Sequence, residues 1–271
     1  MPATDFLTQY GPWALVAGAS EGIGQEFSRQ LAAKGLNLVL VARRQALLHE
    51  LREELTSNYN IEVLCVPMDL GRPDLFAAAE REVGHLDIGL LVYNACFSNI
   101  APFANASLED KLLTVDVNCR GPLALVTLLA GPMIERQRGG IILMSSASGF
   151  QGAAWLATYA ASKAFTTNLA EGLWEELRGQ GVDVLALVAG ATNTPNFKAV
   201  TPADKQAASF PMEPSDVVRE GLQKLGHGPR HIAGRMNRAV AFVLNRLLPR
   251  RAAVAFMGTQ LRKIYQADQT G

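Results

Sequence analysis

Residues 13–24 read WALVAGASEGIG, a short apolar run that ends in a glycine-rich turn, and the helical stretch QEFSRQLAAK follows at once. Glycines at such a junction allow a tight turn and let backbone N–H groups approach a pyrophosphate where the helix dipole favours an anion. A purely structural turn is the alternative. We expect a strand–turn–helix unit that binds a dinucleotide through Gly18, Ser20, Glu21, Gly22, Ile23 and Gly24.

The rest of the chain repeats this alternation of apolar runs and amphipathic segments. Further apolar runs begin at Leu36, Ile61, Ile88, Gly139 and Val182, with a possible seventh strand near Arg230. Short apolar runs separated by amphipathic helices are typical of a parallel sheet covered on both faces. The sequence therefore predicts an α/β fold of the Rossmann type, a doubly wound parallel sheet in which residues 1–271 form a single domain.

Two later segments depart from the alternation. Residues 191–235 begin with a proline-rich stretch of weak periodicity, which predicts a substrate lid. Residues 236–271 are amphipathic and basic, so we expect a C-terminal extension that covers the substrate, forms a subunit interface or contacts a membrane surface, the last being the less favoured. Arg246, Arg250 and Arg251 interrupt its apolar residues, and a spanning helix is not expected.

Composition points to a small-molecule partner. The chain has 271 residues, of which 49% are hydrophobic, and this is enough for one large core. Lys and Arg number 25, as do Asp and Glu, so charge gives no argument for binding nucleic acid, and none is expected. The first residues, MPATDFLTQYG, lack the basic and apolar regions of a secretory signal, and a cytoplasmic location is expected.

The cysteines and histidines give no metal signature. Three cysteines at wide spacing, without a CxxC pair, fit reduced thiols better than disulfides or a zinc site. Among four histidines, His227 and His231 have helical i, i+4 spacing, but no third ligand is evident nearby. We therefore expect no metal site; the cysteines are Cys65, Cys96 and Cys119.

The second apolar run ends in Arg43 and Arg44, at the point where dinucleotide folds often place an acid that binds the ribose 2′-hydroxyl. No acid is present there. An arginine can instead pair with a 2′-phosphate through charge-assisted hydrogen bonds, which favours NADP(H) over NAD(H). The alternative is that both arginines are solvated residues at the end of the strand.

Tyr159 and Lys163 are four residues apart in a helical segment, so both project from one face. A nearby ammonium favours the phenolate and brings the tyrosine pKa toward neutrality, which suits general acid–base catalysis. Ser146 ends the run IILMSS, at the sheet edge where ligands of open α/β sheets bind. Its hydroxyl is expected to hold a substrate oxygen, with Ser145 and Ser148 as alternatives.

Several motifs together resemble the short-chain dehydrogenase/reductase family, in its order, over roughly residues 11 to 195. They are GASEGIG, VARR, Asp69-Leu70, YNAC at Tyr93, VNCRG at Val117, SSASG and YAASK. The resemblance implies that Asn118, Ser146, Tyr159 and Lys163 form a catalytic tetrad. In it Tyr159 exchanges the proton, Ser146 orients the carbonyl, Lys163 binds the nicotinamide ribose and lowers the tyrosine pKa, and Asn118 holds a water.

The same resemblance implies further cofactor contacts and a homodimer or homotetramer. The departures from the family pattern are Ala17 for a threonine, Cys96 for a glycine and Ala189 for a proline, all outside the tetrad. They affect the geometry of the cofactor loops. The implied contacts are Asp69 and Leu70 with the adenine, Asn94 and Ala95 beside the adenosine ribose, and Gly190, Thr192 and Thr194 with the nicotinamide carboxamide.

A narrower similarity, to bacterial hydroxysteroid dehydrogenases of the 7β-acting type, runs through YGPWALVAGASEGIG, VYNAC, GATNTP and KLGHGPRHIAGRMNR. It implies an oxidoreductase that interconverts a ketone and a secondary alcohol on a bulky apolar substrate. Reductases of fatty-acyl thioesters share the LVLVARR strand end, so a 3-oxoacyl-thioester reductase is an alternative. A non-catalytic NADP(H) sensor or scaffold is the alternative from another class.

Overall fold

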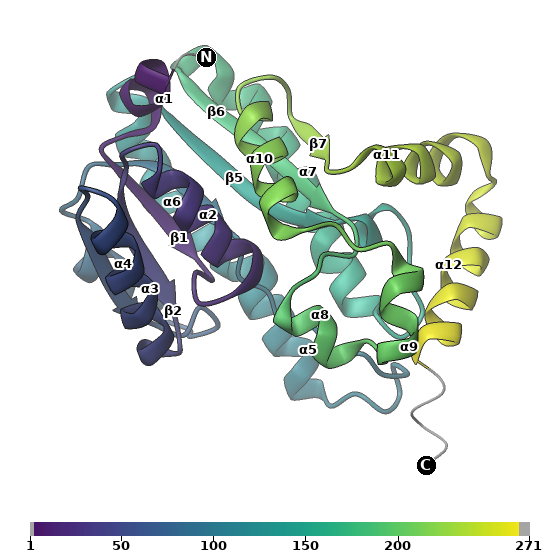
Figure 1. Ribbon diagram of the computed structural model, residues 1–271. Helices are drawn as coiled ribbons and strands as arrows, with labels where there is room; N and C mark the ends of the chain where they lie inside the picture. The colour runs from purple at the N-terminus through teal and green to yellow at the C-terminus, as the bar shows by residue number, and fades with distance from the viewer. Residues whose placement is uncertain (1–2, 266–271) are drawn as a thin grey trace.

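The computed structural model describes residues 3–265, and their strands form one parallel sheet (Figure 1). The strand order is β3-β2-β1-β4-β5-β6-β7, and every neighbouring pair is parallel. The six expected strands and the seventh near Arg230 are confirmed. Their bounds are β1 (Trp13–Ala17), β2 (Asn37–Ala42), β3 (Val63–Pro67), β4 (Ile88–Tyr93), β5 (Gly139–Ser146), β6 (Val182–Ala189) and β7 (Arg230–Ile232).

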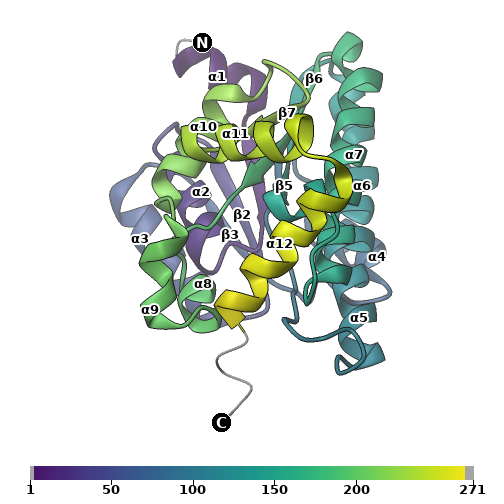
Figure 2. The same ribbon diagram turned by 90° about the vertical axis from the view of Figure 1, so that its right-hand side faces the viewer.

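Helices cover both faces of the sheet, as expected for a doubly wound fold (Figures 1 and 2). One face carries α2 (Gly22–Ala32), α3 (Gln45–Asn58) and α10 (Pro214–Lys224), and the other carries α4 (Leu75–Val83), α6 (Gly121–Glu135) and α7 (Ala157–Leu177). The remaining helices are α1 (Ala3–Tyr10), α5 (Leu108–Val115), α8 (Pro195–Val200), α9 (Ala203–Gln206), α11 (Arg235–Phe242) and α12 (Arg250–Tyr265).

The two faces are filled by alternate residues of the same strands, because successive strand side chains point to opposite sides. In β1, Val16 packs in the core beneath α2 and α3, whereas Leu15 packs in the core beneath α4 and α6. Both side chains are almost completely buried. A strand buried on both sides must be apolar throughout, which explains why these runs show no polar alternation.

The binding crevice lies where the chain reverses its direction of winding. Strand β1 pairs with β2 on one side and with β4 on the other, and the connections after these strands diverge from a common edge. Ligands of open α/β sheets bind beyond the carboxyl ends of the strands at such a point. The turn after β1 and the segment after β4 therefore face one another at the expected ligand site.

The segment 191–235 contains two elements of the scaffold. Helix α10 buries Val217, Val218 and Leu222 against the sheet, and β7 extends the sheet by pairing with β6. The irregular part with α8 and α9 ends before α10. The lid role thus stays a prediction for residues 191–213, and the C-terminal part of the expected segment belongs to the sheet layers.

The C-terminal extension returns across the carboxyl edge of the sheet. After α11 a π-helical turn, η5 (Val243–Leu247), leads to α12, which crosses between α8–α9 and α5–α7 (Figure 2). Residues 266–271 of the expected extension lie outside the described residues. In the part that is described, the run Leu108–Glu135 has the length and apolarity of a membrane span, but 44% of its most apolar window is buried inside the protein.

Candidate active site

The glycine turn brings the segment after β1 into close contact with the segment after β4. Gly18 has a φ of +84°, and a Cβ there would lie 2.7 Å from the Cα of Ala95. The side-chain amide of Asn94 donates to the Gly18 carbonyl at 3.1 Å. A Cβ at Gly24 would overlap that same carbonyl, so Gly24 serves this packing. These glycines allow a backbone contact that other residues would block.

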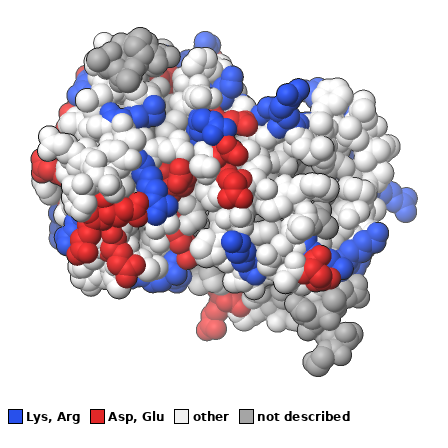
Figure 3. Space-filling model, in the orientation of Figure 1, with Lys and Arg blue, Asp and Glu red and all other residues white. Residues whose placement is uncertain are grey.

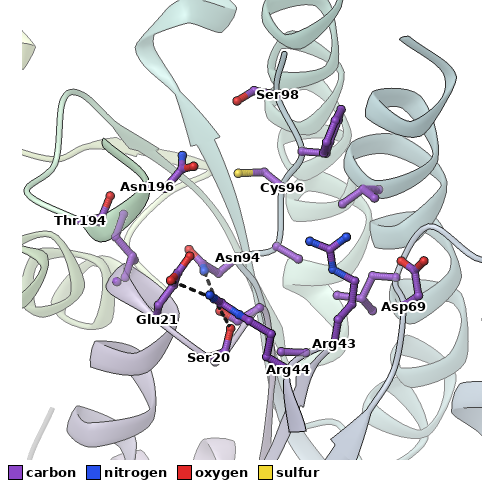
Figure 4. Close-up of a pocket in the computed structure, with 18 of the residues that line it drawn as sticks. Ser20, Glu21, Arg43, Arg44, Asp69, Asn94, Cys96, Ser98, Thr194 and Asn196 are labelled. Atoms are coloured by element: carbon purple, nitrogen blue, oxygen red, sulfur yellow. Dashed lines mark hydrogen bonds and ion pairs between the residues drawn. The ribbon is translucent and has the colours of Figure 1, made fainter. Parts of the chain in front are cut away.

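A cleft of about 440 Å³ opens above this contact (Figure 4). Helix α2 begins in the lining of the cleft with Gly22, and the first N–H groups of a helix have no partner within the helix itself. The volume of the cleft is of the size that small-molecule cofactor sites occupy. The expected cofactor residues that line the cleft are Gly18, Ser20, Glu21, Gly22, Ile23, Arg43, Arg44, Asp69, Leu70, Asn94, Ala95 and Thr194.

The two arginines after β2 differ in their surroundings (Figure 4). Arg44 donates to the Ser20 hydroxyl at 3.0 Å and pairs with the Glu21 carboxylate at 2.9 Å. This pair neutralises the one acid beside the glycine turn, which would otherwise repel a phosphate. Arg43 is exposed, lines the cleft, and has no hydrogen bond or ion pair with any residue of 3–265. Its guanidinium is therefore available to a ligand.

Tyr159, Lys163 and Ser146 come together where α7 begins beside the end of β5. The Lys163 ammonium lies 5.6 Å from the centroid of the Tyr159 ring, and it donates to the Met144 carbonyl at 2.9 Å. Burial raises the pKa of Tyr159, whereas the nearby Ser146 hydroxyl lowers it. The pKa stays above its ordinary value, so the expected lowering by Lys163 is not seen, because burial dominates. Burial lowers the pKa of Lys163. The three side chains thus have the contacts that proton transfer to a substrate oxygen requires.

Asn118 occupies a π-helical turn, η1 (Asp116–Arg120), between α5 and α6. Its side chain is 2% exposed, accepts from the Phe97 N–H at 2.8 Å and donates to the Phe97 carbonyl at 2.9 Å. It also donates to the Ser162 hydroxyl at 2.9 Å. Because both amide atoms bond to protein, Asn118 fixes the loop after β4 against α7. The implied water contact stays a prediction.

Cys96 lies between the cleft and the residues expected to be catalytic. It lines the cleft, and a charge on its sulfur would raise the pKa values of both Tyr159 and Lys163. Tyr159 also lines a small adjoining cavity of about 20 Å³ beneath Trp155. The cleft and the tyrosine are therefore neighbours along one edge of the sheet, with the thiol between them.

Five expected cofactor residues do not line the cleft: Gly24, Tyr159, Lys163, Gly190 and Thr192. A Cβ at Gly190 would lie 2.7 Å from the side chain of Asn237 in α11, so this glycine accommodates the extension. The Thr192 hydroxyl donates to the Gly190 carbonyl at 3.2 Å, and its side chain is buried. Other lining residues were not expected from the sequence: Ala42, Met68, Cys96, Phe97, Ser98, Leu113, Val117 and Asn196.

Helix α12 covers the catalytic residues from the C-terminal side. Leu261 is buried with Leu156 and Ala160, and both Tyr159 and Tyr265 pack against this cluster. Arg250 at the start of the helix donates to the Phe150 carbonyl at 2.6 Å. The wall over Tyr159 is thus mostly apolar. Within residues 3–265, no group of three or more His, Cys, Asp or Glu side chains could hold a metal ion.

Known proteins are similar to this chain in sequence. The family model for short chain dehydrogenases matches residues 12–205. A 7β-hydroxysteroid dehydrogenase of Clostridium sardiniense is 34% identical over 237 residues, which cover 86% of this chain and 90% of that protein. A very-long-chain 3-oxoacyl-CoA reductase of Pyricularia oryzae is 35% identical over 84% of this chain and 70% of its own length.

Solved structures agree with the sequence relatives. One, from work on 7β-hydroxysteroid dehydrogenase stereoselectivity, superposes with a TM-score of 0.88 at 28% identity and covers 93% of this chain and 99% of its own. A short-chain dehydrogenase from Sphingobium yanoikuyae in complex with NADPH has a TM-score of 0.75 at 27% identity, over 88% of this chain and 94% of its own. The chain belongs to the short-chain dehydrogenase family and is an oxidoreductase.

Proposed function

We propose that the protein is an NADP(H)-dependent oxidoreductase that interconverts a ketone and a secondary alcohol on a bulky apolar substrate such as a hydroxysteroid. The observation that carries this proposal is the placement of Tyr159, near Ser146 and 5.6 Å from the Lys163 ammonium, at the same sheet edge as a cleft of about 440 Å³. The positions expected from the sequence thus meet at one edge of the sheet.

The cofactor assignment rests on the unpaired guanidinium of Arg43. A dinucleotide pyrophosphate fits the glycine turn, where Gly18 and Gly22 line the cleft without side chains and helix α2 begins with its N-terminus toward it. Arg43 would hold a 2′-phosphate, and Arg44 is already paired with Glu21. The NADPH complex of the Sphingobium relative supports the same assignment.

In the reductive direction, bound NADPH supplies a hydride to the carbonyl carbon. Tyr159 gives its proton to the oxygen that becomes the alcohol, and Ser146 holds that oxygen by a hydrogen bond. The tyrosine remains protonated at ordinary pH, because burial raises its pKa. The Lys163 ammonium favours the phenolate that forms, and α12 limits access of water to these groups. In the oxidative direction, Tyr159 takes the proton back.

An apolar substrate is supported by the wall over Tyr159, where Leu156, Ala160 and Leu261 are buried together. The similarity to a 7β-hydroxysteroid dehydrogenase over most of both chains favours a steroid. The second candidate is a 3-oxoacyl thioester, favoured by the fungal 3-oxoacyl-CoA reductase and by the basic residues Arg246 and Arg251, which could meet the phosphates of a carrier. A non-catalytic sensor is the remaining alternative.

The deciding experiment is an assay of NADPH consumption with keto-steroids and 3-oxoacyl thioesters side by side, using Tyr159→Phe as the blank. Turnover of a keto-steroid that falls at least 100-fold in Tyr159→Phe supports the proposal, because general acid catalysis typically contributes about 10²–10⁴-fold. Turnover of thioesters alone would favour the second candidate. A protein that binds NADPH tightly but turns over neither would be a sensor.

The same proposal includes a cytoplasmic homodimer or homotetramer. The three free cysteines Cys65, Cys96 and Cys119 suit a reducing compartment. The contact of residues 236–271 with a membrane surface is the less favoured use of the extension, because α12 already packs part of its surface on the catalytic segment.

A further inference from the structure

Gln151 is a buried side chain whose amide has no partner. It lies between Ser146 and Tyr159 in the chain, directly after the short turn η2 (Ala147–Phe150). Only 4% of its surface is exposed. Neither Oε1 nor Nε2 makes a hydrogen bond with any residue in the described part of the chain. Most buried polar side chains are paired, so an amide with both ends unpaired needs an explanation.

The other buried polar atoms without partners are simpler cases. Arg120 and Arg136 each leave Nε unpaired, but another nitrogen of the same guanidinium donates to a backbone carbonyl. Thr201 leaves a single hydroxyl unpaired at the end of α8. In Gln151 the whole functional group is unsatisfied, and it offers both a donor and an acceptor.

The chain neighbours of Gln151 pack against the C-terminal extension and against the cluster that Tyr159 contacts. Its neighbour Phe150 lies 5.6 Å from the Arg230 guanidinium and accepts a hydrogen bond from Arg250. On its other side, Ala153 is buried with Leu261 in the cluster that Tyr159 contacts. The segment 150–153 therefore lies between α7 and the extension, which crosses the front of the molecule in Figure 2.

We propose that the Gln151 amide is a second polar anchor for the substrate, and that it binds an oxygen function remote from the reacting carbonyl. This inference rests on the proposed function and specifies its substrate class. The cluster that holds Ala153, two residues after Gln151, consists mainly of apolar side chains, so an apolar ketone bound against it would have one amide close by. A hydroxyl group uses both the donor and the acceptor of that amide. The substrate is therefore an apolar ketone that carries a second hydroxyl group.

The test compares Gln151→Leu with wild type on two keto-steroids that differ only in one hydroxyl remote from the ketone. We expect kcat/KM for the hydroxylated ketone to fall about tenfold, mainly through KM, which corresponds to about 1.4 kcal/mol. The value for its deoxy analogue should be unchanged. Gln223→Leu, an exposed position on α10, is the matched control and should affect neither ketone. If Gln151→Leu lowered kcat/KM equally for both ketones, Gln151 would not bind the remote hydroxyl, and the proposal would be overturned.

A substrate-free measurement separates this inference from the proposed function. Removing an unpaired buried amide should leave the melting temperature of Gln151→Leu no lower than that of wild type, with unchanged affinity for NADPH. A fall of several degrees would show that the amide is satisfied within the folded protein and would refute the proposal, as would weaker NADPH binding. If wild type reduces neither ketone, the proposed function fails, and the melting comparison still decides whether the amide is free for a ligand.

Discussion

The two arginines after β2 are adjacent in the chain, yet only Arg43 is free to bind a cofactor phosphate. We predict that Arg43→Ala weakens NADPH binding about 10- to 100-fold, because a hydrogen bond to a charged group contributes about 1.5–3 kcal/mol. NADH lacks the 2′-phosphate, and its affinity should change little. Fluorescence titration of both cofactors measures the difference.

Arg81 on α4 offers a matched control for this substitution. It is exposed, lies outside the cleft and pairs with no acid among residues 3–265. Arg81→Ala should bind both cofactors as wild type does. If Arg43→Ala weakened the binding of NADPH and NADH equally, Arg43 would contact a part that the two cofactors share. This result would contradict its assignment to the 2′-phosphate.

Ser146 affects the chemistry through the pKa of Tyr159. Burial raises that pKa, and the nearby Ser146 hydroxyl lowers it, so Ser146→Ala should raise it further. Alcohol oxidation needs the phenolate, whose fraction grows as pH rises through this pKa. We predict that Ser146→Ala shifts the rising limb of the kcat/KM profile for oxidation to higher pH and lowers the rate at neutral pH about 10²-fold or more. An unshifted profile would contradict the role.

The sequence allowed the site residues to be predicted from their types and spacing, but it did not show with which side chains they pair. Tyr159, Lys163 and Ser146 were expected together, because strand ends and helix spacing place them at one edge. The sequence could not distinguish Arg43 from Arg44, since the difference depends on the ion pair with Glu21. It gave no indication of Gln151, because an isolated glutamine ordinarily lies on the surface.

At the scale of elements, one carboxylate joins α10, β7 and α11. Glu220 accepts from His231 at 2.7 Å, from Arg238 at 2.9 Å and from the Gly234 N–H at 3.2 Å. Partial burial raises its pKa, but these hydrogen bonds outweigh burial and leave the pKa below its ordinary value. Its ionised form therefore stabilises the fold and holds the start of the extension on the sheet.

We predict that Glu220→Gln lowers the melting temperature at pH 7 by a few degrees, from a loss of about 1–2 kcal/mol. The stabilisation is fully present above the unfolded pKa of about 4.3 and is lost as pH falls through the lower folded pKa. The two proteins should thus converge only once the pH has fallen below the folded pKa of Glu220. Glu175 forms an exposed ion pair with Arg178, so the control Glu175→Gln should change the melting temperature little. If the difference in melting temperature between Glu220→Gln and wild type did not depend on pH, the stabilisation would not come from the charge of Glu220.

Elements with strong periodicity were predicted well, and those defined by long-range packing were not. The strands are apolar because both faces are buried, and this appears directly in the sequence. Helix α10 follows a proline-rich stretch and has polar outer residues, so it was included in the lid segment. Its place in the scaffold depends on contact with α2, which lies far away in the chain.

For the whole molecule, charge is balanced in total but unevenly distributed. Figure 3 shows acidic and basic side chains interspersed on one half of this face and mainly basic ones around the other half, where α11 and α12 lie. Residues 235–265 contain seven Lys and Arg side chains and no acid. This surface suits anionic groups, either on a substrate carrier or on a membrane, and flotation with anionic vesicles distinguishes the membrane alternative.

Self-association should use a different surface, formed by exposed apolar side chains of α5 and the start of α6. Leu108, Leu112, Val115 and Leu123 are 69%, 52%, 44% and 42% exposed, although they belong to a helical run whose other side is packed on the protein. The first three share one helical face by their spacing. A stable dimer buries about 1,200–2,000 Å² in total, and such a face would form an apolar centre for it.

We predict that sedimentation velocity shows a dimer or tetramer for wild type and a smaller species for Leu112→Glu combined with Leu123→Glu, because each carboxylate would have to be desolvated in the interface. The monomer should retain its affinity for NADPH, since neither leucine lines the cofactor cleft. Phe242→Glu, at a 59% exposed position of α11, is the control. If it alone dissociates the protein, the C-terminal extension forms the subunit interface, and the apolar surface on α5 has another partner.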